Sequence, residues 1–338
     1  LQRLGGTPIE VLANDEMFGL LLPAMRADLE LLETYVHRPG PSLDIPLHVF
    51  GGFLDERTPL IDLPLWRSCT RGETQIEARP GGHFFSQSAA RMLLSSLTPA
   101  SAQEGPAPSA DLHIIRLDRD PHIVSACRGW LDDSERQRAD RFVRPEDGRR
   151  FTVAHGSLRL TLGRRLGIAP GEVRFTSRPG GKPELHRDHH SDVRFNLSHS
   201  DGLALVLIAD GREFGVDIER IREDVDHLPL ADRFLSPAER LSVSGASDDT
   251  RPARFFACWT GREAYSKARG RGLSLPLDEY AIRLDDRGHP CGVVDRTLPG
   301  TAKQWHLAGL NVADGFAAAV AGEDAILRLR LFDDPVEW

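Results

Sequence analysis

The stretch Gly215-Val216-Asp217-Ile218-Glu219 alternates apolar and acidic side chains. In an extended strand, successive side chains point to opposite faces, so Asp217 and Glu219 share one face and Val216 and Ile218 share the other. Two carboxylates on one face make half of a site with oxygen ligands. The stretch therefore predicts a β-strand that carries such a half-site.

A second stretch, residues 255–267 (FFACWTGREAYSK), repeats aromatic and apolar residues at helical spacing. Glu263 and Lys267 are four residues apart and so share a helix face. Three carboxylates brought together repel one another unless protons or a cation neutralise them. Oxygen donors in that number suit Mg²⁺ or Mn²⁺ rather than Zn²⁺, and usually serve phosphate chemistry. Taken singly, each stretch also fits a solvated strand edge or a surface ion pair, so other segments must decide.

The composition is that of an ordinary water-soluble protein. The 338 residues are 40% hydrophobic and 27% charged, which is enough for a sizeable core and favours two domains. No apolar run approaches the length that crosses a bilayer, and the first ten residues lack the pattern of a signal peptide. We therefore expect a cytoplasmic protein without a membrane partner.

Charge and cysteine usage exclude two further classes. A net charge of −8 disfavours non-specific binding to nucleic acid, which needs a basic surface. The four cysteines are scattered and form no Cys-x-x-Cys pair, which argues against a structural zinc site and a disulfide framework. Any phosphate site must therefore be basic only locally.

Residues 98–110 (TPASAQEGPAPSA) lack apolar periodicity and read as an interdomain linker. The linker separates a smaller unit, residues 1–97, from a larger one, residues 111–338, which begins with an alternating strand pattern. Helices and strands then mix to the C-terminus. We expect an α/β protein with two units of unequal size.

The smaller unit has the pattern of a partial α/β-hydrolase. Asp55 follows a predicted strand at residues 46–52, and His83 follows another at residues 74–78, in the chain order of the last two members of a Ser-Asp-His triad. The segment resembles the C-terminal part of type II thioesterases from peptide and polyketide assembly lines. No Gly-x-Ser-x-Gly occurs anywhere in the sequence. Without a serine to activate, thioesterase activity is not expected of this chain, and we expect a longer product to hold the nucleophile upstream.

The larger unit carries groups suited to phosphate. Gly180-Gly181-Lys182-Pro183 offers a loop that lets backbone N–H groups and one ammonium approach an anion, and residues 195–200 (FNLSHS) add Ser and His donors. An arginine-rich segment upstream has guanidinium groups that suit a terminal phosphate monoester, although such a segment also fits a solvated helix face. Its members are Arg136, Arg138, Arg141, Arg144, Arg149 and Arg150.

The order of these signals is specific where each alone is weak. The arginine-rich segment, Gly-Lys-Pro, Asn-Leu-Ser-His-Ser, Gly-Val-Asp-Ile-Glu and Trp-Thr-x-x-Glu-Ala-x-x-Lys follow one another from residue 111 to the C-terminus. In this order the segment resembles the Sfp-type 4′-phosphopantetheinyl transferases. The resemblance implies a monomer with two similar α/β halves, residues 111–214 and 215–338, and with coenzyme A between them.

The resemblance also implies residue roles. Asp217, Glu219 and Glu263 would hold Mg²⁺ on the pyrophosphate of coenzyme A. Binding and catalytic roles beyond the metal fall on eight residues. Lys182 and Lys267 would neutralise the pyrophosphate, His199 and Arg138 would contact the 3′-phosphate, Ser198 and Arg150 would line the same pocket, and Glu263, or as a fallback Glu239, would be the base. Arg262 stands where the family commonly has Lys.

The implied reaction moves the phosphopantetheine arm of coenzyme A onto a serine of an apo carrier protein and releases 3′,5′-ADP. Two alternatives stay open: a thioesterase-like hydrolase within a longer protein, and a carrier-docking module without chemistry. The thioesterase-like segment favours peptidyl or polyketide carriers of secondary metabolism. A loop with His186, Asp188, His189, His190 and Asp192 is read as an exposed connector, with a transition-metal site as the less favoured hypothesis.

Overall fold

The computed structural model describes residues 9–36, 38, 40–85, 109–178, 180–271, 276, 278–297, 305–323, 328–332 and 334–335. Helices and strands mix along the chain, so the expected α/β class is confirmed. None of the helices within these ranges is long and apolar enough to cross a membrane. The described helices are α1 (Ile9–Leu12), α2 (Asp15–Thr34), α4 (Pro121–Trp130), α5 (Asp133–Asp140), α6 (Pro145–Leu166), α7 (His227–Phe234), α8 (Pro237–Ser244) and α9 (Arg251–Arg269), with 3₁₀ turns η2 (Leu60–Cys69), η3 (Pro170–Glu172) and η4 (Arg187–His189).

The strands form two principal sheets and two hairpins. The larger sheet has the order β1-β2-β13-β3-β7-β6, and the smaller has the order β11-β12-β8. The hairpins are β4–β5 and β9–β10. The strands are β1 (Leu47–Gly52), β2 (Thr74–Arg79), β3 (Ser109–Arg116), β4 (Phe175–Ser177), β5 (Pro183–Leu185), β6 (Val193–Ser200), β7 (Leu203–Asp210), β8 (Phe214–Arg220), β9 (Tyr280–Leu284), β10 (Pro290–Asp295), β11 (His306–Leu310), β12 (Phe316–Gly322) and β13 (Arg328–Phe332).

The larger unit repeats one topology. In the first half β3 is followed by α6, the hairpin β4–β5, and then β6 and β7, and the three long strands pair antiparallel in the order β3-β7-β6. In the second half β8 is followed by α9, the hairpin β9–β10, and then β11 and β12, which pair in the order β8-β12-β11. The two halves therefore have the same fold, as the resemblance implies.

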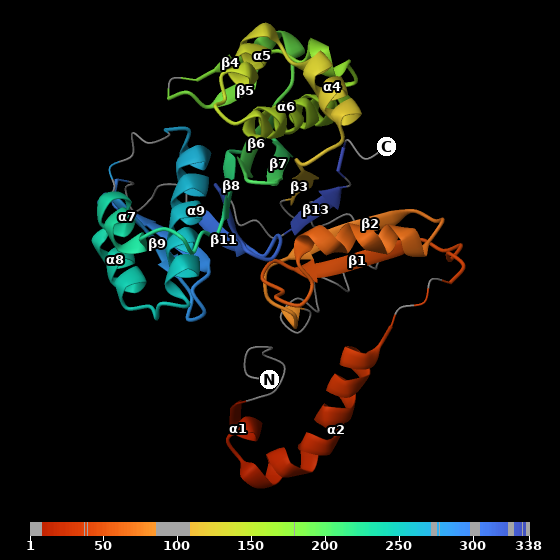
Figure 1. Ribbon diagram of the computed structural model, residues 1–338, viewed down its shortest axis with the longest axis vertical. Helices are drawn as coiled ribbons and strands as arrows, with labels where there is room; N and C mark the ends of the chain where they lie inside the picture. The colour runs from red at the N-terminus through yellow and green to blue at the C-terminus, as the bar shows by residue number, and fades with distance from the viewer. Residues whose placement is uncertain are drawn as a thin grey trace, which may run out of the picture.

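The long helix of each half packs on its sheet. Helix α6 begins with Pro145 at its first turn and ends at Gly167, whose φ of 70° suits a glycine C-cap. Its residues Val153, Leu158 and Leu162 are buried in one core cluster with side chains of β6 and β7. Figure 1 shows α6 above β6 and β7, and α9 beside β8.

Gly215 sets the distance between β8 and α9. A Cβ at this position would lie 2.2 Å from the carbonyl oxygen of Ala264 and 2.5 Å from the backbone nitrogen of Ala268, so only glycine permits the approach. The strand and the helix that carry the acidic residues are consequently held backbone to backbone.

The smaller unit shares its sheet with the larger one. Strand β1 pairs parallel with β2, and β2 pairs antiparallel with β13, which pairs parallel with β3. Phe53, Leu60 and Ile76 belong to the same buried cluster as Leu112 and Leu329. The two units expected from the sequence therefore have a common hydrophobic core, and β13 returns from the second half to the sheet of the first.

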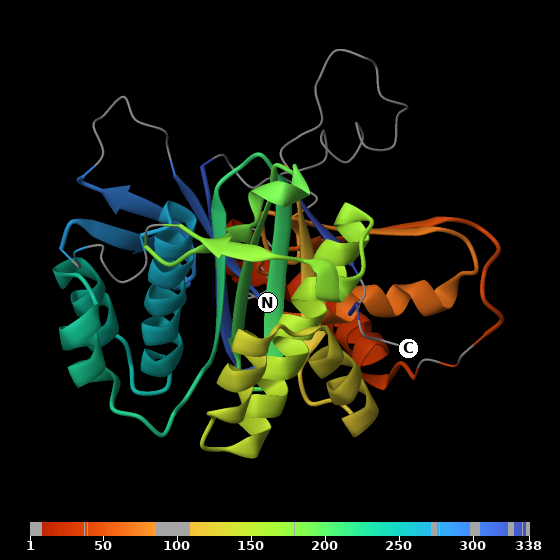
Figure 2. The ribbon, with the colours of Figure 1, turned by 90° about the horizontal axis from the view of Figure 1, so that it is seen from above.

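The expected boundaries differ in detail. Most of the linker predicted at residues 98–110 lies outside the described residues, but its last two, Ser109 and Ala110, already belong to β3. The boundary expected between residues 214 and 215 falls at the start of β8. Helix α2 spans Asp15–Thr34, with no side chain buried. It stands clear of the sheets in Figure 1, and Figure 2 gives the view from above.

Candidate active site

A cleft of about 680 Å³ opens between the two halves of the larger unit. Its walls come from α5, α6, the loop between β4 and β5, strand β6, and the C-terminal half of α9. Five residues predicted for the site line it together: Arg138, Lys182, His199, Glu263 and Lys267. Residues from four distant parts of the chain thus converge as the resemblance implies.

Strands β6 and β8 are joined by side chains on one side. The backbone N–H of Val216 donates to the side-chain oxygen of Asn196 at 2.8 Å, that of Ile218 to Ser198 Oγ at 3.3 Å, and that of Arg220 to Ser200 Oγ at 3.0 Å. The partners advance in the same direction, so the two strands run parallel. The alternate residues of Asn-Leu-Ser-His-Ser therefore connect the two sheets, a role that the analysis of the sequence missed although their spacing of two was visible.

Asp217 is the buried centre of the acidic group. Its Oδ1 accepts hydrogen bonds from Lys267 Nζ at 2.6 Å and Ser198 Oγ at 2.7 Å. Its Oδ2 is buried and has no hydrogen-bond partner. An orphaned buried carboxylate oxygen is costly unless something positive meets it. One oxygen of Asp217 is therefore held by hydrogen bonds, and the other is available to a cation.

Glu219 and Glu263 are both partly buried and both lie near the negative charge of Asp217. Burial raises the pKa of Glu219, and the charge of Asp217 raises it further, while Ser200 and Trp259 donate hydrogen bonds to it. Burial also raises the pKa of Glu263, followed by the charges of Asp217 and Glu219. The charge of Asp217 therefore disfavours ionisation of both glutamates, and the charge of Glu219 disfavours ionisation of Glu263.

The carboxylate oxygens of Asp217, Glu219 and Glu263 are the type of ligand that a hard divalent cation prefers. The buried, unpartnered oxygen of Asp217 lies near two glutamates whose pKa values its charge raises, and such a set of oxygen donors favours a divalent ion. Within the described ranges, however, no group of three or more His, Cys, Asp and Glu side chains is gathered so that it could hold a metal ion. The ammonium of Lys267, on Asp217, supplies the positive charge instead.

Lys182 reaches the cleft from a glycine turn. Gly180 and Gly181 have φ values of 105° and 85°, and a Cβ on Gly180 would lie 2.6 Å from the carbonyl oxygen of Gly270. The turn therefore needs glycine both for its backbone and for its approach to the end of α9. Lys182 Nζ donates to Glu213 at 2.9 Å and to the carbonyl of Phe214 at 3.0 Å, and burial lowers its pKa.

His199 and Arg138 lie on the opposite wall. His199 is exposed at the wall of the cleft. Desolvation by the protein groups around its ring nevertheless lowers its pKa to about 4, and the neighbouring His155, Lys267 and Arg138 lower it further. Arg138 stacks its guanidinium over the ring of Phe151 at 5.2 Å. At neutral pH His199 is therefore a neutral hydrogen-bonding group beside fixed cations.

Five of the residues predicted for the site are not part of the cleft wall: Arg150, Ser198, Asp217, Glu219 and Glu239. Arg150 forms ion pairs with Asp118 at 2.7 Å and with Asp201 at 2.5 Å. Ser198 donates to Asp217 and so positions that acid. The roles that the resemblance implies for Arg150 and Ser198 toward coenzyme A stay predictions.

Glu239 lies away from the cleft wall, in the packing of α8. It is buried and accepts hydrogen bonds from Arg262 at 2.8 Å and from the backbone N–H groups of Ser236 and Ile282 at 2.7 Å. A carboxylate so fully engaged is unsuited to accept a proton from a substrate. Its partner Arg262, whose role the sequence left undefined, stacks over Tyr280 at 4.1 Å and completes a buried ion pair.

The smaller unit brings its predicted pair together. His83 Nδ1 lies 3.0 Å from Asp55 Oδ2, and the buried Asp55 also accepts from the backbone of Arg57 at 2.8 Å and Thr58 at 3.2 Å. Among the described residues, no Ser, Thr or Cys is hydrogen-bonded to His83, whose partner is Asp55.

Comparisons with known proteins match the smaller unit and the larger unit to different families. Residues 213–321 match the family model described as 4′-phosphopantetheinyl transferase superfamily, residues 121–211 match 4′-phosphopantetheinyl transferase, N-terminal, and residues 1–99 match Thioesterase domain. The chain is 38% identical over 216 residues to the 4′-phosphopantetheinyl transferase HetI of Nostoc sp., covering 63% of this chain and 88% of HetI. It is 29% identical to the 4′-phosphopantetheinyl transferase Sfp of Bacillus subtilis, covering 56% and 81%.

Two further similarities are partial. Thioesterase PikA5 of Streptomyces venezuelae is 40% identical over 85 residues, which cover 25% of this chain and 30% of PikA5. A solved holo-(acyl-carrier-protein) synthase from Bacillus anthracis in complex with CoA (3′,5′-ADP) is 26% identical, with a TM-score of 0.24, and covers 32% of this chain and 93% of that chain.

The repeated α/β halves and the polar cleft between them define an enzyme of the transferase class. The extensive similarity to HetI makes the assignment specific: the chain belongs to the 4′-phosphopantetheinyl transferase family, with a thioesterase-like segment before it. The resemblance noted in the sequence is thereby confirmed.

Proposed function

We propose that the chain transfers the 4′-phosphopantetheine arm of coenzyme A to a serine of an apo carrier protein, with Mg²⁺, and releases 3′,5′-ADP. The observation that carries the proposal is the cleft, which Arg138, Lys182 and Lys267 line together with Glu263. Lys267 also donates to Asp217 beside it. Fixed cations beside carboxylates suit a ligand with several phosphates and a metal ion.

Asp217, Glu219 and Glu263 would hold the metal. Bound there, Mg²⁺ would neutralise charge on the pyrophosphate oxygens. Mn²⁺ has the same preference for oxygen ligands and is the expected substitute.

The basic residues bind and orient coenzyme A. Lys267 and Lys182 neutralise the pyrophosphate, for which Lys182 exchanges its contact with Glu213 for a phosphate oxygen. Arg138 and His199 receive the 3′-phosphate at the opposite wall. Because the reaction is governed by positioning and by charge on phosphate oxygens, these contacts supply most of what the protein contributes.

The proton of the acceptor serine goes to Glu263. As the serine oxygen bonds to the β-phosphorus, the bond from that phosphorus to the oxygen of 3′,5′-ADP breaks and the departing oxygen keeps the electron pair. Glu263 lines the cleft, whereas Glu239 forms an ion pair with Arg262. We therefore favour Glu263 over Glu239 as the base.

The direct test is to incubate the chain with Mg²⁺, coenzyme A and an apo carrier, and to weigh the carrier. We expect the mass of one phosphopantetheine group to be added, with 3′,5′-ADP as co-product and no addition in EDTA. An unmodified carrier that still binds the chain would favour the docking module instead. Peptidyl or polyketide carriers are the first to test, given the similarity of the N-terminal segment to PikA5.

A second candidate function rests on the Asp55–His83 pair. This pair is formed as a hydrolytic triad requires and would serve a thioesterase if a nucleophile were supplied. Acyl-carrier thioesters provide the substrate for its test. Hydrolysis that His83→Ala abolishes would support it, and a rate equal to the buffer rate would exclude it for this chain.

A further inference from the structure

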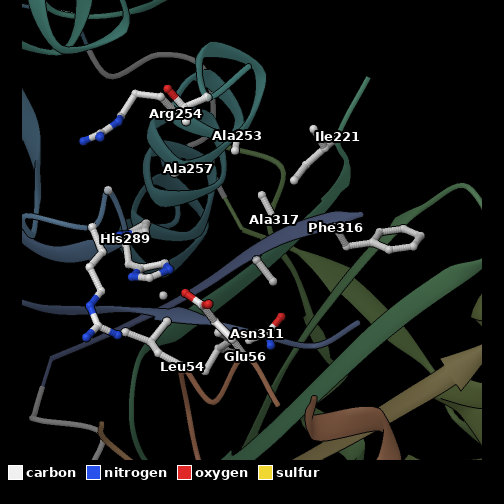
Figure 3. A pocket seen from close by; sticks show the side chains of 17 residues that line it. Leu54, Glu56, Ile221, Ala253, Arg254, Ala257, His289, Asn311, Phe316 and Ala317 are labelled. Carbon is white, nitrogen blue, oxygen red and sulfur yellow. The ribbon is translucent and has the colours of Figure 1, made fainter. Parts of the chain in front are cut away.

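A second pocket, of about 320 Å³, lies at the junction of the thioesterase-like segment with the second half of the transferase. Figure 3 shows it beneath the N-terminal half of α9. Its wall includes Leu54 and Glu56 from the loop after β1, together with residues of α9, β11, β12 and the turn before β10. Glu263 lies nine residues along α9 from Arg254, or about 14 Å, so this pocket is distinct from the cleft.

One end of the pocket is apolar. Ile221 and Phe316 lie there in Figure 3, and Leu54, Ala257 and Leu310 also contribute to the wall. Phe316 is held in place by the guanidinium of Arg220, which stacks over its ring at 5.2 Å. A fixed aromatic ring beside aliphatic side chains favours the hydrocarbon part of a ligand.

The other end is basic and depends on a tight turn. Arg254 and His289 lie at this end in Figure 3, and Arg287 belongs to the same wall. Asp285 shapes the turn by accepting from the backbone N–H groups of Arg287 at 3.0 Å and His289 at 2.8 Å. Gly288, with φ of 94°, completes it, since a Cβ there would lie 2.8 Å from Arg254 Cζ.

The charged side chains of the pocket wall determine which charge of ligand the pocket favours. Within the described part of the chain, neither Arg254 nor Arg287 forms an ion pair with an acid, whereas His289 lies 3.4 Å from Asp285. Glu56 is the acid of the wall. Two guanidinium groups against one carboxylate leave one positive charge, which suits a monoanion better than a phosphate dianion.

We propose that this pocket binds an amphipathic monocarboxylate, with its carboxylate on Arg254 and Arg287 and its hydrocarbon chain against Phe316. The pocket volume suits a small ligand such as a medium-chain fatty acid. The inference concerns binding alone and does not depend on the proposed transferase chemistry.

Isothermal titration of the full chain with octanoate tests the proposal, with octanol and octylamine as neutral and cationic probes. We expect one octanoate per chain and no measurable binding of octylamine. Octanol should bind at least about tenfold more weakly, a difference of about 1.4 kcal/mol. Equal binding of the three probes, or no binding of octanoate, would overturn the assignment.

Two variants test whether octanoate binds in this pocket. Arg254→Gln removes the carboxylate contact, and Ala253→Trp fills the pocket from an exposed position on α9 without disturbing the core. Each should weaken octanoate binding at least about tenfold. Arg240→Gln, on the exposed surface of α8, is the matched control and should leave it unchanged. Octanoate affinity that survives both pocket variants would show that the ligand binds elsewhere.

Discussion

At the scale of single residues, Asp217 links the site most closely to the fold. Its one oxygen is fixed by Lys267 and Ser198, and its other oxygen is buried without a partner. The strand pattern placed it beside Glu219, but only the tertiary structure shows what each of its two oxygens meets.

We predict that Asp217→Asn lowers carrier modification at least about 100-fold, because an amide keeps the shape but neither neutralises Lys267 nor serves a divalent cation well. Transfer rates over a range of Mg²⁺ concentrations measure the effect. Ser198→Ala, which removes only the positioning hydroxyl, should lose less activity and recover partly at high Mg²⁺. Equal rates for Asp217→Asn and the wild type would contradict the metal assignment.

His199 gives the protein a pH-dependent stability. Its pKa falls from 6.5 to about 4 on folding, so between these values the unfolded chain binds more protons than the folded one. Stability is therefore lost as pH falls from about 6.5 towards 4. Urea unfolding at pH 7 and pH 4.5 should show a larger loss for the wild type than for His199→Gln, and an identical loss would refute the assigned pKa.

At the scale of elements, a single acid ties three of them together. Glu239 closes the capping box of α8 with Ser236, pairs with Arg262 of α9, and accepts the backbone N–H of Ile282 in β9. The pair is almost fully buried on both sides. Removing one partner of such a pair leaves the other charge without compensation.

We predict that Glu239→Ala lowers the free energy of unfolding by about 3–5 kcal/mol, as for other broken buried ion pairs. Urea unfolding measures the loss, and Glu146→Ala, at an exposed position in α6, should change stability by less than about 0.5 kcal/mol. The folded fraction of Glu239→Ala should keep its transfer rate at low temperature. A stable but inactive variant would restore Glu239 as a catalytic acid.

At the scale of the whole molecule, the thioesterase-like segment is part of the transferase's hydrophobic core. Strand β2 covers the edge of β13, and four large side chains of the segment, Phe53, Leu60, Leu63 and Ile76, are buried in the shared cluster. Each such burial stabilises by about 1.5–3 kcal/mol. Together they match the net stability of a typical domain, about 5–15 kcal/mol.

We predict that a chain starting at residue 109 aggregates or unfolds cooperatively at a much lower temperature, because it exposes the core and the edge of β13. A chain starting at residue 41 lacks α1 and α2 but removes no buried side chain of α2, and should keep the melting temperature within a few degrees. Calorimetry measures the melting temperatures of the two truncated chains and of the full chain. Equal melting temperatures would show that the segment is dispensable.

Much of the site could be predicted because its elements are defined by short-range patterns. Alternation in residues 215–219 and the four-residue spacing of Glu263 and Lys267 follow from backbone geometry, which the local sequence determines. The ion pairs of Arg150 and Glu239 could not be predicted, because a charged side chain reaches several partners, and Asp118, Asp201 and Arg262 are distant in the sequence.

The sequence by itself determined the family, the α/β class, and the strand and helix that carry Asp217, Glu219, Glu263 and Lys267. Only the tertiary structure decided that β13 joins the two units in one sheet, that Ser198 serves Asp217, and that Asp55 meets His83. Local periodicity is limited to neighbours along the chain. Long-range pairing depends on which buried surfaces and charges find partners once the whole chain has folded.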